Sequence, residues 1–222
     1  MTLVCDWVAG MPVTQPAHDK PNKIILLQPL FEEANRFRRT MCQIVRTLDE
    51  AGIHAVVPDL PGMGEHPLGY DTVSVEDIRV ALGSLTHEIA KSGRLLGTAA
   101  FRAGCLFDAW VDNPNHWRFA PESGERFVRT LLRTEDQAES DANRLFVSGQ
   151  RASRMFLTDF ERLGLCPTER FRTVRLSSDR GAADLHVDGS PLWRHAEPGE
   201  DLDLARSLSD DIASWSMTCA AF

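Results

Sequence analysis

The amino-acid sequence predicts an α/β domain built on a mostly parallel sheet with helices on both faces. In the first half of the chain, continuous apolar runs typical of buried strands alternate with amphipathic stretches of helical period. The order strand, helix, strand, helix, strand, helix is the order that right-handed crossovers between parallel strands produce. The chain has 222 residues, 43% of them hydrophobic, which is enough for the core of one domain and makes a second full domain unexpected.

The first half of the chain supplies these elements in a clear order. Residues 1–22 contain three prolines and are expected to form an extended arm or an edge strand leading into the domain. Gly52 is placed to end the first helix. We expect strands over residues 23–28, 55–59 and 94–99, and helices over residues 37–50, 75–91 and 104–110.

The second half has a weaker pattern, and the sheet is expected to be reduced there. Residues 111–149 are a candidate cap over a site at the edge of the sheet. We expect strands over residues 117–120, 171–176 and 183–187, and helices over residues 127–136, 152–163 and 201–215.

Composition excludes several classes of function. The net charge of −8 provides no basic surface for nucleic acid or for an anionic membrane. Five scattered cysteines without a C-x-x-C pair predict neither a disulfide framework nor a zinc site, and no glycine-rich phosphate loop is present, so no metal or cofactor is expected. The longest apolar run, Ile24 to Leu27, is too short to span a membrane, and a secretory signal is absent. The expected location is the cytoplasm.

Two motifs carry a resemblance to the α/β-hydrolases. The turn Asp59-Leu-Pro-Gly-Met-Gly64 directly follows a predicted strand, and Ala100-Phe-Arg-Ala-Gly104 lies at a junction of strand and helix. The second motif has the spacing of a nucleophile elbow, in which small residues allow a sharp turn that raises the central side chain above the sheet. The central residue is Arg102, where a serine is expected. A guanidinium has no lone pair for acyl attack, although it can bind an anion or polarise a carbonyl.

A longer succession of motifs resembles the exosortase A system-associated hydrolases of the second type. The resemblance extends from about residue 23 to residue 215. It implies the α/β-hydrolase fold and a bacterial setting in which exosortase handles exported proteins alongside exopolysaccharide production, but no known substrate. The motifs are residues 28–35 with Arg38-Arg39, the Phe-Arg-Ala-Gly elbow, residues 121–127 with Leu131-Leu-Arg133, and Ser190-Pro-Leu-Trp193.

Three residues are candidates for the remaining catalytic roles. His195, after the last predicted strand, is near the position of a triad base, and Asp179 follows the preceding strand. The two lie 16 positions apart, which leaves no room for the usual intervening helix. Cys105 is a conceivable surrogate nucleophile near a helix N-terminus, but its position on the first helical turn favours a buried core cysteine.

A polar cluster is expected around Arg102 at the carboxyl ends of the strands, where open sheets place ligands. A partly buried arginine needs a carboxylate, and Glu32 or Glu33 is the expected partner. Three interpretations remain open: an ion-pair cluster that fills an abandoned active site, a pocket for a small acidic or carbonyl-bearing ligand, and hydrolysis by an unusual nucleophile. The residues expected near Arg102 are Glu32, Glu33, Asn35, Arg38, Arg39 and Glu122.

Overall fold

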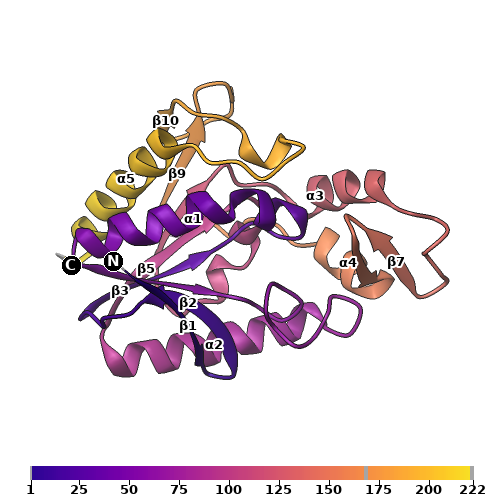
Figure 1. Ribbon diagram of the computed structural model, residues 1–222, viewed down its shortest axis with the longest axis horizontal. Coiled ribbons are helices and arrows are strands. Elements are labelled where there is room, and N and C mark those ends of the chain that lie inside the picture. Colours follow the sequence, from indigo (N-terminus) through magenta and orange to yellow (C-terminus); the bar gives the residue numbers. More distant parts are fainter. Residues whose placement is uncertain (1, 168–169, 221–222) are drawn as a thin grey trace.

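The centre of the molecule is an eight-stranded sheet in the order β1-β2-β4-β3-β5-β6-β9-β10 (Figure 1). The computed structural model describes residues 2–167 and 170–220. From β4 to β10 all neighbouring strands are parallel, whereas β2 is antiparallel to both β1 and β4. The mostly parallel sheet is therefore confirmed. The strands are β1 (Leu3–Val8), β2 (Met11–Pro16), β3 (Asn22–Leu27), β4 (Ile53–Pro58), β5 (Arg94–Phe101), β6 (Asn115–Phe119), β9 (Arg170–Leu176) and β10 (Leu185–Val187).

Three long helices cover the two faces of the sheet. Helices α1 (Glu32–Glu50) and α5 (Leu202–Ala220) lie on one face, and α2 (Val75–Ser92) lies on the other (Figure 1). The N-terminus of α2 is closed by a capping box in which Ser74 and Asp77 each bind the other's backbone N–H. None of the helices in the described parts of the chain is both long and apolar enough to cross a membrane.

Strand β3 shows why the central strands appear in the sequence as continuous runs of apolar residues. Ile24 and Leu26 belong to the hydrophobic core under α1 and α5, whereas Ile25 and Leu27 belong to the core on the α2 side. Successive side chains of a strand point to opposite faces, so a strand covered by helices on both sides needs apolar residues at every position.

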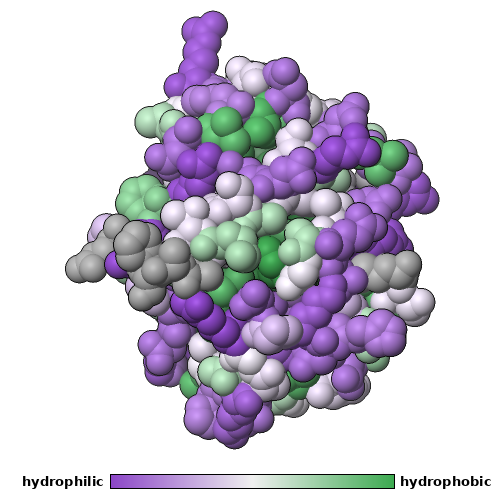
Figure 2. Space-filling view, turned by 90° about the vertical axis from the view of Figure 1, so that its left-hand side faces the viewer, coloured by the Kyte–Doolittle hydropathy of each residue, from purple (hydrophilic) through white to green (hydrophobic). Residues whose placement is uncertain are grey.

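The N-terminal residues form a β-hairpin at one edge of the sheet. Strand β1 is the edge strand, and β2 pairs with β4 through Val13 and Pro58. Pro16 is tolerated at the end of β2 because it lies beyond Val13 and Thr14, the residues that pair with β4, so its missing N–H removes no hydrogen bond to that strand. The end of the molecule that carries both termini presents a mainly polar surface with a few hydrophobic side chains at its centre (Figure 2).

A group of smaller elements lies at the opposite end of the molecule (Figure 1). The residues expected to form a cap, 111–149, also contribute β6 to the main sheet. The smaller elements are α3 (Gly124–Leu131), a two-stranded sheet of β7 (Arg144–Val147) and β8 (Gln150–Ser153), and α4 (Arg154–Glu161).

Two of the predicted helices in this half begin at the wrong residue. The helix expected over 152–163 starts at Arg154, because Ala152 belongs to the unpredicted hairpin β7–β8, whose turn places Ser148 and Gly149 at positive φ. The helix expected over 127–136 spans Gly124–Leu131, because the Ser123 hydroxyl caps the N–H of Arg126. Both boundaries were set by local hydrogen bonds rather than by apolar periodicity.

The helix predicted over 104–110 is wrong. The chain forms two short 3₁₀ helices there, Arg102–Leu106 and Asp108–Trp110. Space is limited, because β6 begins at Asn115 and Pro114 disfavours a helical conformation at the preceding residue. The broken segment also turns the fully buried Asp108 inward to meet Arg118 on β6.

Asp108 and Arg118 form a buried bidentate ion pair. The Arg118 Nε lies 2.5 Å from Asp108 Oδ2, and its Nη2 lies 3.0 Å from Oδ1. Arg118 Nη2 also donates to the carbonyl of Cys166 at 2.8 Å, so the pair joins the elbow segment, β6 and the chain leading to β9. A buried charge of this kind depends on its partner.

We therefore expect Asp108→Ala to lower the free energy of unfolding by about 3–5 kcal/mol, because it leaves the Arg118 guanidinium buried without a counter-charge. The measurement is equilibrium urea denaturation. Asp159→Ala, which removes an exposed ion pair with Arg162, is the matched control and is expected to cost less than about 1 kcal/mol. Equal losses in the two variants would contradict a structural role for the buried pair.

Candidate functional site

The segment after β5 makes a tight turn with Arg102 at its apex, at the position where the sequence predicts a nucleophile elbow. Arg102 has a φ of 56°, in the left-handed region that non-glycine residues rarely occupy. Gly104 is required by close packing, since a Cβ there would lie 2.4 Å from the carbonyl oxygen of Gln28. The strained residue and the close approach are the features that the small residues of an elbow permit.

The Arg102 guanidinium is bound on every side. Its Nε donates to Glu33 Oε2 at 3.1 Å and its Nη2 donates to Glu33 Oε1 at 3.2 Å. Nη2 also binds Glu122, and Nη1 donates to the carbonyl of Ala120 at 3.1 Å. The ring of Trp193 lies 4.5 Å from the guanidinium carbon. Only 12% of the Arg102 side chain is exposed.

The partners of Arg102 come from separate parts of the chain. Glu33 lies in the first turn of α1, Glu122 follows β6, and Trp193 belongs to a 3₁₀ helix in the loop after β10. We refer to these residues, Arg102, Glu33, Glu122 and Trp193, as the Arg102 cluster. It joins the segments that follow four strands of the sheet, β3, β5, β6 and β10.

Burial dominates the electrostatics of the Arg102 cluster. Burial raises the pKa of Glu33, and the neighbouring Glu122 carboxylate adds to this effect, while the charge and hydrogen bonds of Arg102 oppose it. Glu122 is 7% exposed and has a second cationic partner, because Arg126 Nε lies 3.1 Å from its Oε1. Two buried carboxylates are therefore balanced mainly by one guanidinium.

Sequence reasoning placed two of the six expected residues correctly beside Arg102, namely Glu33 and Glu122. Among the interactions of the described residues, none joins the other four to Arg102. Glu32 pairs at 3.8 Å with Arg36, which in turn donates to the carbonyl of Trp193. The remaining three are exposed on α1: Asn35, Arg38 and Arg39.

The Trp193 ring and the Ala120 carbonyl were not expected as partners of Arg102. The position of Trp193 carried a usable signal, because the loop after the last parallel strand must return past the same edge of the sheet as the elbow. The Ala120 carbonyl could not have been predicted as a partner, because its direction depends on the positive φ of 44° that Ala120 adopts.

The candidate catalytic residues are engaged elsewhere. Cys105 is fully buried, its Sγ donates to the Ala100 carbonyl at 3.2 Å, and burial raises the pKa of its thiol well above the usual value. Asp179 accepts the Gly181 N–H and an Arg175 N–H, both at 2.8 Å, and the Gly181 hydrogen bond lowers its pKa. His195 Nε2 lies 2.7 Å from Ser190 Oγ.

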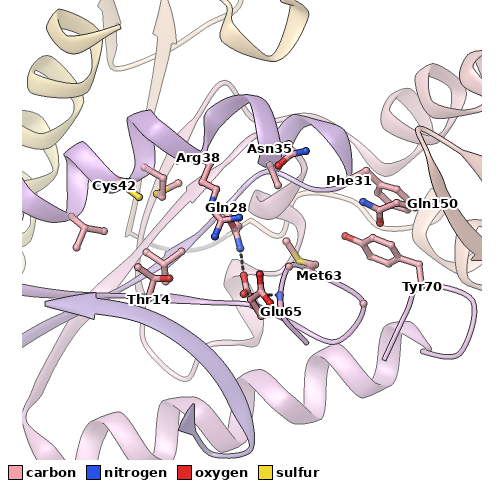
Figure 3. A pocket seen from close by; sticks show the side chains of 17 residues that line it. Thr14, Gln28, Phe31, Asn35, Arg38, Cys42, Met63, Glu65, Tyr70 and Gln150 are labelled. Atoms are coloured by element: carbon pink, nitrogen blue, oxygen red, sulfur yellow. Dashed lines mark hydrogen bonds between the residues drawn. The ribbon is translucent and has the colours of Figure 1, made fainter. Parts of the chain in front are cut away.

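A cavity of about 340 Å³ lies beside the cluster, between α1, β2 and the loop that follows β4 (Figure 3). Its lining includes Asn35 and Arg38 but not Arg102. No group of three or more His, Cys, Asp or Glu side chains in the described residues is arranged to hold a metal ion.

Comparison with known proteins gives similarity at the level of the fold. No family model matches the sequence, and no curated protein does. Among solved structures, Est1E from Butyrivibrio proteoclasticus aligns with a TM-score of 0.66 at 11% identity, covering 99% of each chain. A soluble variant of monoglyceride lipase from Saccharomyces cerevisiae aligns with a TM-score of 0.60 at 12% identity, covering 98% of this chain and 95% of the lipase.

A serine hydrolase without a lid from Xanthomonas campestris also aligns, with a TM-score of 0.55 at 13% identity over 96% of this chain and 94% of the other. These similarities agree with the mostly parallel eight-stranded sheet flanked by helices. The chain has the α/β-hydrolase fold.

Proposed function

We propose that this chain is a non-catalytic binding or accessory protein on an α/β-hydrolase fold. The observation that carries the proposal is the state of Arg102, which stands at the apex of the elbow, offers no nucleophilic lone pair and is enclosed by Glu33, Glu122 and Trp193. A serine hydrolase needs an activated nucleophile at that point. The guanidinium is also too enclosed to serve as the ligand contact itself.

The Arg102 cluster has a structural explanation that fits this proposal. Removing one partner from a buried charge network costs several kcal/mol, so the cluster holds α1, the segment after β6 and the loop after β10 in fixed positions. Those segments form the edge of the sheet at which ligands bind in this class of fold. In this proposal the former catalytic position stabilises the scaffold, and binding takes place next to it.

A second candidate function is hydrolysis by a different nucleophile. Ser190 Oγ lies 2.7 Å from His195 Nε2, which is the contact that a serine and its general base require. Against this, the neighbouring Asp201 accepts backbone N–H groups of Ser190 and Leu204 rather than binding the imidazole. Nothing among the described interactions orients His195 from its other nitrogen, so the pair lacks the third member of a triad.

We further propose that the protein works with an exosortase and exopolysaccharide system in a bacterium. The support is the ordered succession of sequence motifs from the Gln28 segment to Ser190-Pro-Leu-Trp193. Deletion of the gene in its host is expected to change the yield of extracellular polysaccharide or the processing of exosortase substrates. Unchanged polysaccharide and unchanged processing in the deletion strain would reject this association.

The non-catalytic proposal predicts that the purified protein neither turns over a panel of p-nitrophenyl esters nor reacts with a fluorophosphonate probe. The physical reason is that Arg102 cannot attack a carbonyl or phosphorus centre. Intact-mass spectrometry after incubation with the probe is the measurement. Labelling of the wild-type chain that disappears in Ser190→Ala and persists in Ser177→Ala would establish the competing hydrolase instead.

The Arg102 cluster also predicts a pH-dependent loss of stability. Arg102→Met leaves the carboxylates of Glu33 and Glu122 buried without their shared cation. Burial already raises the pKa of Glu33 above the unfolded value of about 4.3, and the substitution removes the main interaction that opposes this rise. A carboxyl whose pKa is raised on folding contributes stability at low pH that is lost as the pH rises. The variant should therefore be destabilised more at pH 7 than at pH 5, by about 3 kcal/mol or more at pH 7.

Urea denaturation of Arg102→Met and wild type at the two pH values tests this. The control is Arg102→Met combined with Glu33→Gln and Glu122→Gln, in which the extra loss at pH 7 should disappear because no buried carboxylate remains to ionise. A loss that is equal at both pH values would show that the cluster does not depend on charge balance.

A further inference from the structure

We infer that the cavity beside α1 binds a small neutral polyol of the size of a monosaccharide or disaccharide. The inference rests on the proposed function, since it assigns a ligand class to a protein that binds rather than hydrolyses. The cavity volume of about 340 Å³ falls within the range of about 300–1,000 Å³ that is usual for small-molecule sites. Arg102 does not line it, so this site is distinct from the elbow.

The walls of the cavity are formed before any ligand arrives. Its base is apolar, where Met41 and Val45 of α1 face Val57 of β4. On one side the ring of Phe31 stacks on Tyr70 with centroids 4.0 Å apart and planes 9° from parallel. This stack joins the loop after β3 to the loop after β4, so neither side of the cavity has to be organised on binding.

The mouth of the cavity is polar and carries both signs of charge. Gln28 donates to Asp59 Oδ1 at 2.9 Å, and the other carboxylate oxygen of Asp59 accepts the Glu65 N–H at 3.0 Å. Arg38 reaches from α1 toward Gln28, with Glu65 on the far side (Figure 3). Among the described ion pairs, none joins Arg38 to Asp59 or Glu65, so the cation and the carboxylates face the cavity separately.

This set of groups matches hydroxyls better than it matches a charged ligand. Carboxylates only accept hydrogen bonds, a guanidinium only donates them, and side-chain amides do both. A hydroxyl both donates and accepts, so several hydroxyls on one ligand can satisfy all three kinds of group. An anion attracted by Arg38 would also meet Asp59 and Glu65, and a cation attracted by those carboxylates would meet Arg38.

Amide side chains extend the hydrogen-bonding surface around the cavity. Asn35 lies one helical turn before Arg38 on α1, and Gln150 is contributed by the hairpin β7–β8. Figure 3 shows these two side chains on the side of the cavity where Phe31 and Tyr70 lie. The smaller elements of the second half therefore complete the site that the main sheet begins.

The test is saturation-transfer difference NMR followed by titration, with D-glucose, D-galactose, D-mannose and maltose as probes. Glucuronate and inorganic phosphate serve as charged comparisons. We expect saturable binding of at least one sugar to the full chain. Arg38→Gln and Glu65→Gln should each weaken that binding by about tenfold or more, which is the effect of losing a hydrogen bond to a charged group.

Arg39→Gln and Glu50→Gln are the matched controls, because both residues are exposed on α1 and neither lines the cavity. They should leave the dissociation constant unchanged. The inference is overturned if no sugar binds saturably, if phosphate or glucuronate binds more tightly than the sugars, or if the four variants behave alike. Such a failure leaves the non-catalytic proposal standing, because that is decided by ester turnover and covalent labelling.

Discussion

The arrangement of this end of the molecule depends on one buried positive charge, the Arg102 guanidinium at the end of β5. The Arg102 backbone lies in the left-handed region, and its guanidinium is held by hydrogen bonds to Glu33, Glu122 and the Ala120 carbonyl. Neutralising the guanidinium then requires Glu33 and Glu122 to stay in place, and Trp193 covers the face that remains. Charge balance in a low-dielectric site thereby holds the first turn of α1 and the segment after β6 in position.

Helix α1 contributes residues both to the Arg102 cluster and to the cavity. Glu33, in the first turn of α1, points to Arg102, while Asn35 and Arg38, farther along the helix, line the cavity. Residues two and five positions apart on a helix face different directions, so one helix can serve both sites.

The main sheet could be predicted from the sequence because each of its central strands can be recognised from a short stretch of residues, and several strands show the same pattern. Strands β3, β4 and β5 are apolar at nearly every position, and each is followed by a helix or by a recognisable turn. The hairpin β7–β8 was missed because its strands have only four residues each and carry no clear alternation. The broken segment after Arg102 was missed because its course depends on Arg118, a residue ten positions after Asp108 on another strand.

The candidate site was predictable only in part, for a related reason. The need of Arg102 for a carboxylate follows from elementary electrostatics, and the sequence offered Glu32 and Glu33. The choice between them depends on the direction in which the first turn of α1 faces, which periodicity near a helix end does not define. The general position of Trp193 follows from the course of the loop after β10, but its contact with the guanidinium depends on how that loop packs, which no local pattern of residues defines.

The reciprocal dependence within the Arg102 cluster limits which substitutions the chain can tolerate there. A serine introduced at position 102 would leave two buried carboxylates without their shared counter-ion, so this single substitution lowers the stability of the fold. Neutralising either carboxylate first would in turn weaken the hold on the arginine. The members of the cluster are therefore expected to be replaced together rather than one at a time, because each single substitution leaves a buried charge without its partner.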